Sequence, residues 1–141
     1  MIVSFAMFAD AANISQEGKL NILGVFDAVQ VGAMPAVHPR AHLVVRFKGT
    51  PIDTGLHAVA LRWTDPAGQE LWASEGQVEL AQPPSGVTEV DIPLIATIDL
   101  PLTMQGTYEM RVVVNGELRG AVPLHVRAAA PFVAPATGLV S

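Results

Sequence analysis

The chain has 141 residues, half of them hydrophobic and only 15% charged, with a formal net charge of −5 at pH 7. It contains no cysteine, which excludes disulfides, thiolate nucleophiles and cysteine-ligated zinc. Its 8 basic residues are scattered among 13 acidic ones and form no cluster able to follow a phosphate backbone, so we expect no nucleic-acid partner.

Strand-like alternation begins at the first residues. The opening segment has no basic residue before Lys19, and no uncharged apolar run approaches the ~18 residues that a membrane helix needs. We therefore expect a soluble cytoplasmic protein that contacts no membrane. The first three strands are predicted at Ile2–Ala9, Leu20–Val31 and Ala41–Lys48, and Met34–Arg40 is predicted to be a loop because it contains two prolines.

The second predicted strand is apolar on both faces. Leu20, Ile22 and Phe26 alternate along it with Leu23 and Val25. This pattern is typical of a central strand covered on both sides, or of a strand with one face covered by another chain. The glycine at position 24 predicts a bulge or a close backbone approach.

The later strands are separated by recognisable turns. Asp65–Gly68 has proline at its second position and glycine at its fourth, which favours a type I turn, and Asn115–Gly116 favours a type I′ hairpin. We expect Gly76 to bend its strand, and Pro93 to place its strand at a sheet edge or in a bulge. These strands are predicted at Leu56–Thr64, Gln69–Leu80, Val87–Leu100, Tyr108–Val114 and Glu117–Arg127.

About eight strands with no helical apolar period predict an all-β protein, an antiparallel immunoglobulin-like sandwich over residues 1–127. The stretch Gly106–Gly116 resembles the late hairpin of such sandwiches, in which a tyrosine, here Tyr108, packs at a corner. Residues 128–141 form an uncharged, Ala/Pro-rich tail. Its larger apolar residues, which we expect to pack on this domain or on another subunit, are Phe132, Val133, Leu139 and Val140.

The opening of the chain also carries a family resemblance. The segments A-D-A-A-N (Ala9–Asn13) and G-K-L-N-I-L-G-V-F-D (Gly18–Asp27) resemble the N-terminal signature of a family of small bacterial proteins of unknown function. The resemblance is close over these residues and extends over the rest of the chain only as a strand pattern. It implies a single β-sandwich domain and no catalytic residue.

Two groups of residues are candidates for metal ligands. The histidines do not have a spacing that places three ligands together, and the polar residues of the opening turn lack the D-x-D-x-D spacing of calcium loops. We expect no metal or other cofactor, with these side chains serving in loops, turns and caps. The two groups are His38, His42, His57 and His125, and Asp10, Asn13, Glu17 and Asp27.

Catalytic patterns are also missing from the sequence. It has no G-x-S-x-G elbow and no Gly-rich phosphate loop before a helix. The carboxylate pairs are more simply explained as solvated strand positions than as a glycosidase dyad. We therefore expect no enzymatic activity. The pairs are Glu75 with Glu79, and Glu89 with Asp91.

Low charge, the doubly apolar second strand and the apolar tail together predict a structural or protein-interaction domain. We expect it to act by forming a homo-oligomer or by docking to a larger assembly through the tail. The alternative is a module that binds a carbohydrate or another small molecule on exposed aromatic side chains. Trp72 is the candidate for that stacking, but the simpler expectation is that Trp63 lies in the core with Trp72 partly buried beside it and Tyr108 at the corner.

Overall fold

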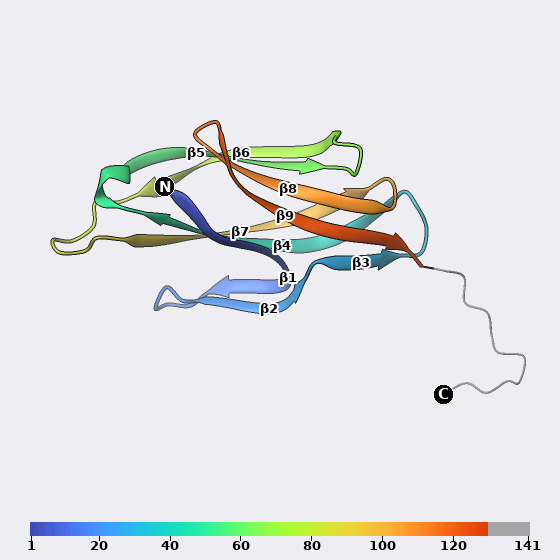
Figure 1. The fold of residues 1–141 in the computed structure, drawn as a ribbon. Coiled ribbons are helices and arrows are strands. Elements are labelled where there is room, and N and C mark those ends of the chain that lie inside the picture. Colours follow the sequence, from blue (N-terminus) through green and yellow to red (C-terminus); the bar gives the residue numbers. More distant parts are fainter. Residues whose placement is uncertain (130–141) are drawn as a thin grey trace, which may run out of the picture.

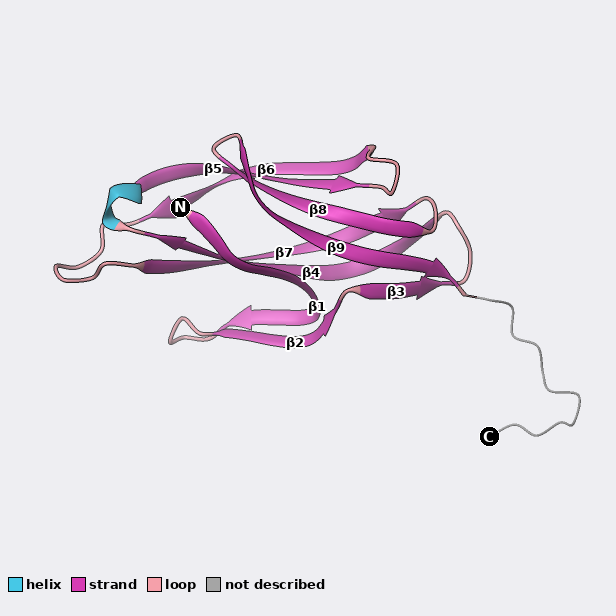
Figure 2. Ribbon diagram, viewed as in Figure 1, coloured by secondary structure: helices cyan, strands magenta, loops and turns pink. Residues whose placement is uncertain are grey.

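Two packed β-sheets make up the part of the protein that the computed structural model describes, residues 1–129 (Figures 1 and 2). The strand order is β2-β1-β4-β7 in one sheet and β3-β9-β8-β5-β6 in the other. The predicted all-β class is confirmed. The elements are β1 (Ile2–Ile14), β2 (Leu20–Phe26), β3 (Ala28–Val31), β4 (Ala36–Gly49), the 3₁₀ turn η1 (Pro51–Asp53), β5 (Gly55–Thr64), β6 (Glu70–Leu80), β7 (Val90–Leu102), β8 (Gly106–Val114) and β9 (Glu117–Ala128).

The core lies between the two sheets and is centred on aromatic side chains. Trp63 is fully buried, as predicted, and its ring stacks on Tyr108 with 5.2 Å between centroids. Phe8 meets the same indole edge-on at 5.9 Å. The indole Nε1 donates a hydrogen bond of 2.9 Å to the carbonyl of Pro101, so the one polar group of this side chain is satisfied.

Both predicted tight turns are confirmed. The amide of Gly68 donates to the carbonyl of Asp65 at 2.9 Å, and the Asp65 carboxylate accepts the amides of Ala67 and Gln69. Asn115 and Gly116 have φ values of 50° and 81°, as a type I′ turn requires at both central positions. These turns join β5 to β6 and β8 to β9 as antiparallel pairs.

The predicted second strand, Leu20–Val31, is two strands in different sheets. The chain bends at Asp27, whose carbonyl accepts the amide of His125 at 2.8 Å. Before this residue β2 pairs antiparallel with β1, and after it β3 pairs parallel with β9, from Ala28↔His125 to Val31↔Ala128. The predicted antiparallel arrangement therefore holds for most pairings but not for this one. Residues 1–129 contain nine strands rather than about eight.

The predicted loop over Met34–Arg40 was wrong from Ala36 onward, because β4 begins there. Pro39 lies in a register shift between His38 and Ala41 in the pairing of β4 with β7, whereas Pro35 precedes the strand. Arg40 has a φ of 49° in this bulge, and its amide donates to Oδ1 of Asp99 at 2.9 Å. A strand interrupted in this way lacks the alternation that identifies strands in a sequence.

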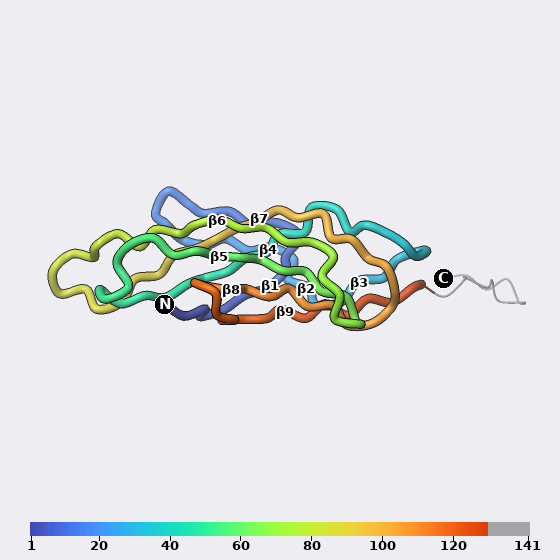
Figure 3. The backbone as a smooth tube through the Cα atoms, turned by 90° about the horizontal axis from the view of Figure 1, so that it is seen from above, coloured from blue at the N-terminus to red at the C-terminus, as the bar shows by residue number. Residues whose placement is uncertain are grey.

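Two further predictions concern the edges of the sheets. Pro93 lies in β7, which is an edge strand as predicted. Gly76 does not bend its strand: β6 is continuous, and Gly76 pairs in register with Val59. The edges β6 and β7 lie side by side along one long side of the molecule (Figure 3).

The start of the chain is anchored to η1. The ammonium group of Met1 donates to Oδ1 of Asp53 at 3.0 Å, and the amide of Thr50 donates to Oδ2 at 2.8 Å. The hydrogen bond from the Thr50 backbone, followed by that from the N-terminal ammonium, lowers the pKa of Asp53 below its ordinary value of 3.8. A lowered folded-state pKa means that ionised Asp53 stabilises the fold above its unfolded pKa and that this contribution is lost as the pH falls through the folded value.

We expect Asp53→Asn to lower the free energy of unfolding at pH 7, because asparagine has no negative charge and keeps only one of the two acceptor oxygens. The difference in free energy of unfolding between variant and wild type should shrink as the pH falls below about 4. Protonation of Asp53 in the unfolded chain begins there, so the stabilisation by its charge is progressively lost. Urea unfolding at several pH values between 2.5 and 7 measures this difference. A deficit that does not change with pH would contradict the role of the charge.

The described residues 1–129 contain no helix long and apolar enough to cross a membrane. The candidate tail residues Phe132, Val133, Leu139 and Val140 lie outside the described part of the chain.

Candidate functional site

The most unusual feature of the fold is the hairpin of β1 and β2. From Ile2 to Ala9, β1 pairs with β4, and from Phe8 to Ile14 it pairs with β2, so Phe8 and Ala9 pair on both sides. The part of β1 that follows the β4 pairing folds back with β2, and this hairpin lies beneath β4 and β7 (Figure 1). We call residues 10–26 the arm.

A groove of about 460 Å³ marks where the arm meets the outer face of this sheet. Its lining comes from both sides of the contact. The arm contributes Gly18, Lys19, Leu20 and Ile22, and the sheet contributes Phe5, Arg46, Asp91 and Pro93.

The arm covers apolar residues on the outer face of the sheet. Val44 alternates along β4 with Leu43 and Val45, which belong to the core between the sheets, so Val44 points outward. It is nevertheless fully buried. A fully buried residue on the outward side of β4 shows that this face is covered.

The backbone of the arm is fixed by a close contact at Gly24. This residue has a φ of 71°, and a Cβ added to it would lie 2.3 Å from Oδ2 of Asp10. The predicted close approach at this glycine is confirmed. Near the tip, the amide of Ser15 donates to the carbonyl of Lys19 at 2.8 Å, and the side chain of Asn21 donates to that of Asn13 at 2.9 Å.

The two faces of the arm differ in exposure. Leu20 and Ile22 are half-buried over the groove, whereas Leu23 and Val25, on the opposite face, are 72% and 60% exposed. The prediction of a central strand covered on both sides by its own domain was therefore wrong, because β2 is an edge strand with one open face. The other alternative, a face covered by another chain, stays a prediction.

The histidines are only partly brought together. His38 and His42 line a cleft of about 400 Å³ with Asp10, Pro39 and Arg40, next to the bulge of β4. The ring of His38 lies against Phe26, with centroids 5.2 Å apart, and Nδ1 of His42 is 3.2 Å from the carbonyl of Arg40. Within residues 1–129 no group of three or more His, Cys, Asp or Glu side chains is placed to hold a metal ion.

The other two histidines have separate structural partners. The ring of His57 bonds to the Asp53 carbonyl and to the side chain of Asn115. His125 lies 3.0 Å from the hydroxyl of Thr107 on the exposed face of β9.

The acids of the opening turn do not converge either. Asp10 lies over Gly24, and Glu17 forms an exposed ion pair with Lys19 at 3.1 Å. Asp27 lies at the bend between the two sheets. The capping and turn hydrogen bonds expected of these acids stay a prediction.

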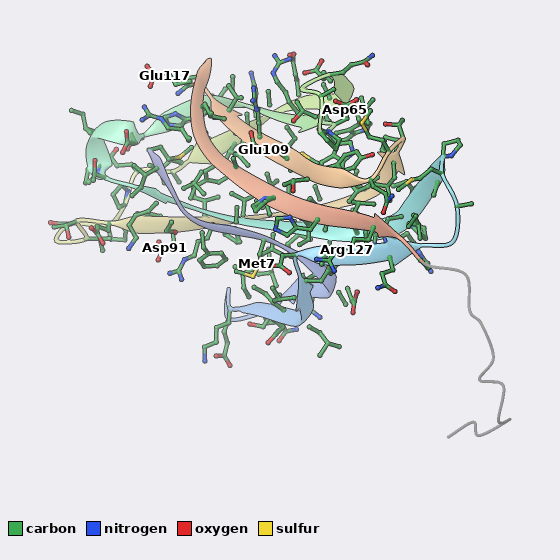
Figure 4. The ribbon with its side chains drawn as sticks, turned by 45° about the vertical axis from the view of Figure 1, so that its right-hand side comes forward. Met7, Asp65, Asp91, Glu109, Glu117 and Arg127 are labelled. Atoms are coloured by element: carbon green, nitrogen blue, oxygen red, sulfur yellow. The ribbon has the colours of Figure 1, made fainter. Side chains whose placement is uncertain are left out.

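The paired carboxylates are spread over the surface. Glu89 and Asp91 pair with Lys48 and Arg46, while Glu75 and Glu79 are exposed on β6. Figure 4 shows Asp91 on the four-stranded sheet, and Glu109 and Glu117 on the five-stranded sheet. No two of these carboxylates share an enclosed site in the described residues, as paired acid–base catalysis would require.

Trp63, Trp72 and Tyr108, the aromatic residues considered for ligand stacking, form no open platform. Trp63 and Tyr108 are fully buried, and Trp72 is half-buried against the core. The hydroxyl of Tyr108 donates to the carbonyl of Met104 at 2.7 Å and accepts the amides of Thr103 and Met104 at 2.8 Å. Stacking of a ligand on Trp72 stays a prediction.

Comparisons with other proteins place the chain in a family without placing it in a pathway. No curated protein matches it. Among solved structures, it is similar to the Pseudomonas fluorescens alkylpurine DNA glycosylase AlkC bound to DNA containing an abasic site analog, at 14% identity and a TM-score of 0.42. That match covers 87% of this chain and 30% of the glycosylase chain. The profile of a family of unknown function, DUF6941, matches residues 4–127, and the chain is a member of that family.

Proposed function

We propose that this protein is a non-enzymatic interaction domain with an immunoglobulin-like topology, and that it associates with a second copy of itself through the arm. The observation that carries the proposal is the exposure of Leu23 and Val25 on the open face of β2. The topology is supported by the two packed sheets and by the hydrogen bonds of the Tyr108 hydroxyl at the β7–β8 corner.

The charges of the arm fit an antiparallel self-contact. No charged residue occurs from Leu20 to Phe26, and Lys19 and Asp27 flank this segment at equal distance from Leu23. Two arms that run antiparallel about Leu23 therefore place Lys19 of each copy beside the partner's Asp27. A contact of this kind is self-complementary, as a two-fold symmetric dimer requires.

We expect Leu23→Lys to abolish self-association, because it places two like charges at the centre of the proposed contact. Sedimentation velocity over a range of protein concentrations measures the change. The matched control is Leu56→Lys on β5, because Leu56 is similarly exposed at 63% and lies on the other sheet. A wild type that stays monomeric at 100 micromolar would contradict the proposal.

A charge exchange tests the antiparallel arrangement itself. Lys19→Asp or Asp27→Lys alone should weaken the dimer about tenfold, because each change breaks two symmetric pairs worth up to about 1 kcal/mol each. The double variant should regain the lost affinity. If it associates no better than the single variants, the two arms do not run antiparallel about Leu23.

The role of the tail needs a truncation that leaves β9 intact. The amide of Ala128 donates to the side chain of Gln105, and that of Ala129 to the carbonyl of Val31, so a chain cut after Arg127 would lose both bonds. A chain cut after Ala129 keeps them. Association that survives this cut is due to the described domain, and association that is lost would assign it to residues 130–141.

A further inference from the structure

β6 is a second open edge of the fold, at one side of the five-stranded sheet. β6 is an 11-residue edge strand that pairs with β5 in continuous register from Gly55↔Leu80 to Trp63↔Trp72. It contains no proline, lysine or arginine. Proteins commonly protect sheet edges with such residues, with bulges or by keeping the strand short.

The other edges of the described sheets carry these protections. β7 contains Pro93 and Pro101, β3 has only 4 residues, and β2 is interrupted by the positive φ of Gly24. The outer backbone groups of β6 are therefore the longest regular set available for pairing with an added strand.

The inward side of β6 leaves a cavity between the two sheets. Ser74 and Gly76 pair with Leu61 and Val59, whose side chains belong to the core, yet both β6 residues are exposed. A Cβ added to Gly76 would meet no atom within 4 Å. The cavity has a volume of about 160 Å³, and its apolar lining is made by Val59, Leu61, Val78, Leu94 and Ala96.

This cavity can receive a side chain from outside. It lies between β6 and β7, the two adjacent edges on one side of the sandwich (Figure 3). An apolar protein cavity of about 150 Å³ is large enough to hold benzene. One branched aliphatic side chain therefore fits beside Gly76.

The outward side of β6 is acidic. Glu75 and Glu79 are exposed and form no ion pair within residues 1–129, while Glu70 pairs with Arg62 at 2.9 Å. A second β6 would bring acid against acid, because this strand has no basic residue. Residues 130–141 also lack a basic residue, and they contain two prolines. Charge complementarity therefore requires a partner strand that is basic.

We propose that β6 accepts an extended segment of another protein in which apolar residues alternate with lysine or arginine. The segment adds a strand to the five-stranded sheet, one apolar side chain enters the cavity beside Gly76, and the basic side chains face Glu75 and Glu79. Strand addition uses backbone hydrogen bonds for affinity and alternate side chains for specificity. The inference does not depend on self-association through the arm.

The test uses the full-length protein and a nine-residue synthetic peptide of alternating lysine and valine, with a peptide of alternating glutamate and valine as its counterpart. Backbone amide chemical shifts, followed by NMR during titration, locate the contact and give the dissociation constant. We expect the lysine peptide to shift amides of β6 and of its neighbours in the cavity, and the glutamate peptide to bind at least tenfold more weakly.

Two variants separate strand addition from general attraction between opposite charges. Gly76→Val fills the cavity and should weaken binding of the lysine peptide at least tenfold without unfolding the protein. Glu75→Lys should weaken it similarly, whereas Glu17→Lys, with the same change of charge on the arm, should not. The proposal is overturned if the lysine peptide causes no shifts on β6, if Gly76→Val binds it as tightly as the wild type, or if Glu17→Lys weakens it as much as Glu75→Lys.

Discussion

Replacement of Trp63 by alanine is expected to lower the free energy of unfolding by about 3 to 5 kcal/mol, the range observed for removing a large aromatic side chain from a core. Trp63 is fully buried between the sheets, where it contacts the rings of Phe8 and Tyr108. Its loss creates a cavity and removes the hydrogen bond to the carbonyl of Pro101. Urea unfolding followed by circular dichroism measures the change.

Two control variants divide this effect into its causes. Trp63→Phe keeps a ring but loses the indole N–H, so its cost should be smaller, about 1 to 3 kcal/mol. Trp72→Ala removes the same type of side chain from a half-buried position on β6 and should cost less than Trp63→Ala. Equal losses for Trp63→Ala and Trp72→Ala would show that the core is not centred on Trp63.

Gly24→Ala is expected to destabilise the arm by about 2 to 4 kcal/mol, through backbone strain and a steric clash together. The φ of 71° is unfavourable for alanine, and the new methyl group would lie 2.3 Å from Oδ2 and 3.0 Å from Cβ of Asp10. Because the Cβ of Asp10 is itself this close, rotation of its carboxylate alone does not clear the methyl group. Hydrogen exchange of the arm amides and urea unfolding measure the effect.

Gly18 provides a control for the strain alone. Its φ of 81° is similar, but an added Cβ would have no atom within 4 Å. We expect Gly18→Ala to cost only about 1 to 2 kcal/mol, and Asp10→Gly to recover part of the loss caused by Gly24→Ala. Equal costs for Gly18→Ala and Gly24→Ala would show that the arm tolerates a side chain at this position.

The parts of the fold that could be predicted from the sequence are those determined by local chemistry. Asp65–Gly68 and Asn115–Gly116 form the expected turns because proline, asparagine and glycine restrict or permit specific φ values. The alternation in β5 and β8 identified Trp63 and Tyr108 as inward-facing residues. Neither result depends on which strands are neighbours in the sheets.

The errors occurred where distant residues decide the local structure. The passage from β2 to β3 takes place at Asp27, and the apolar pattern continues through this residue without a proline or glycine to mark the break. The bond from the amide of His125, far along the chain, holds it there. Similarly, Met34–Arg40 contains two prolines and was predicted to be a loop, but pairing with β7 makes most of it strand.

The candidate surfaces were predictable only in part. The apolar character of both faces of Leu20–Phe26 was visible in the sequence, but not which face the sheet covers and which stays exposed. The cavity beside Gly76 could not be predicted, because a glycine within a strand indicates a bend as readily as a missing side chain. A bend and a site left open by a missing side chain are distinguished only by the position of β7 beside β6.

The parallel pairing of β3 with β9 affects the order in which the protein can fold during synthesis. Ala28 pairs with His125, so β3 has no partner in its sheet until nearly the whole domain has left the ribosome. The hairpin of β1 and β2 and its pairing with β4 involve only the first 49 residues and can form much earlier. Pairings between distant segments form slowly because the intervening chain must first be ordered. The four-stranded sheet thus begins to form first, and β9, which follows the other strands of residues 1–129 in the chain, closes the other sheet.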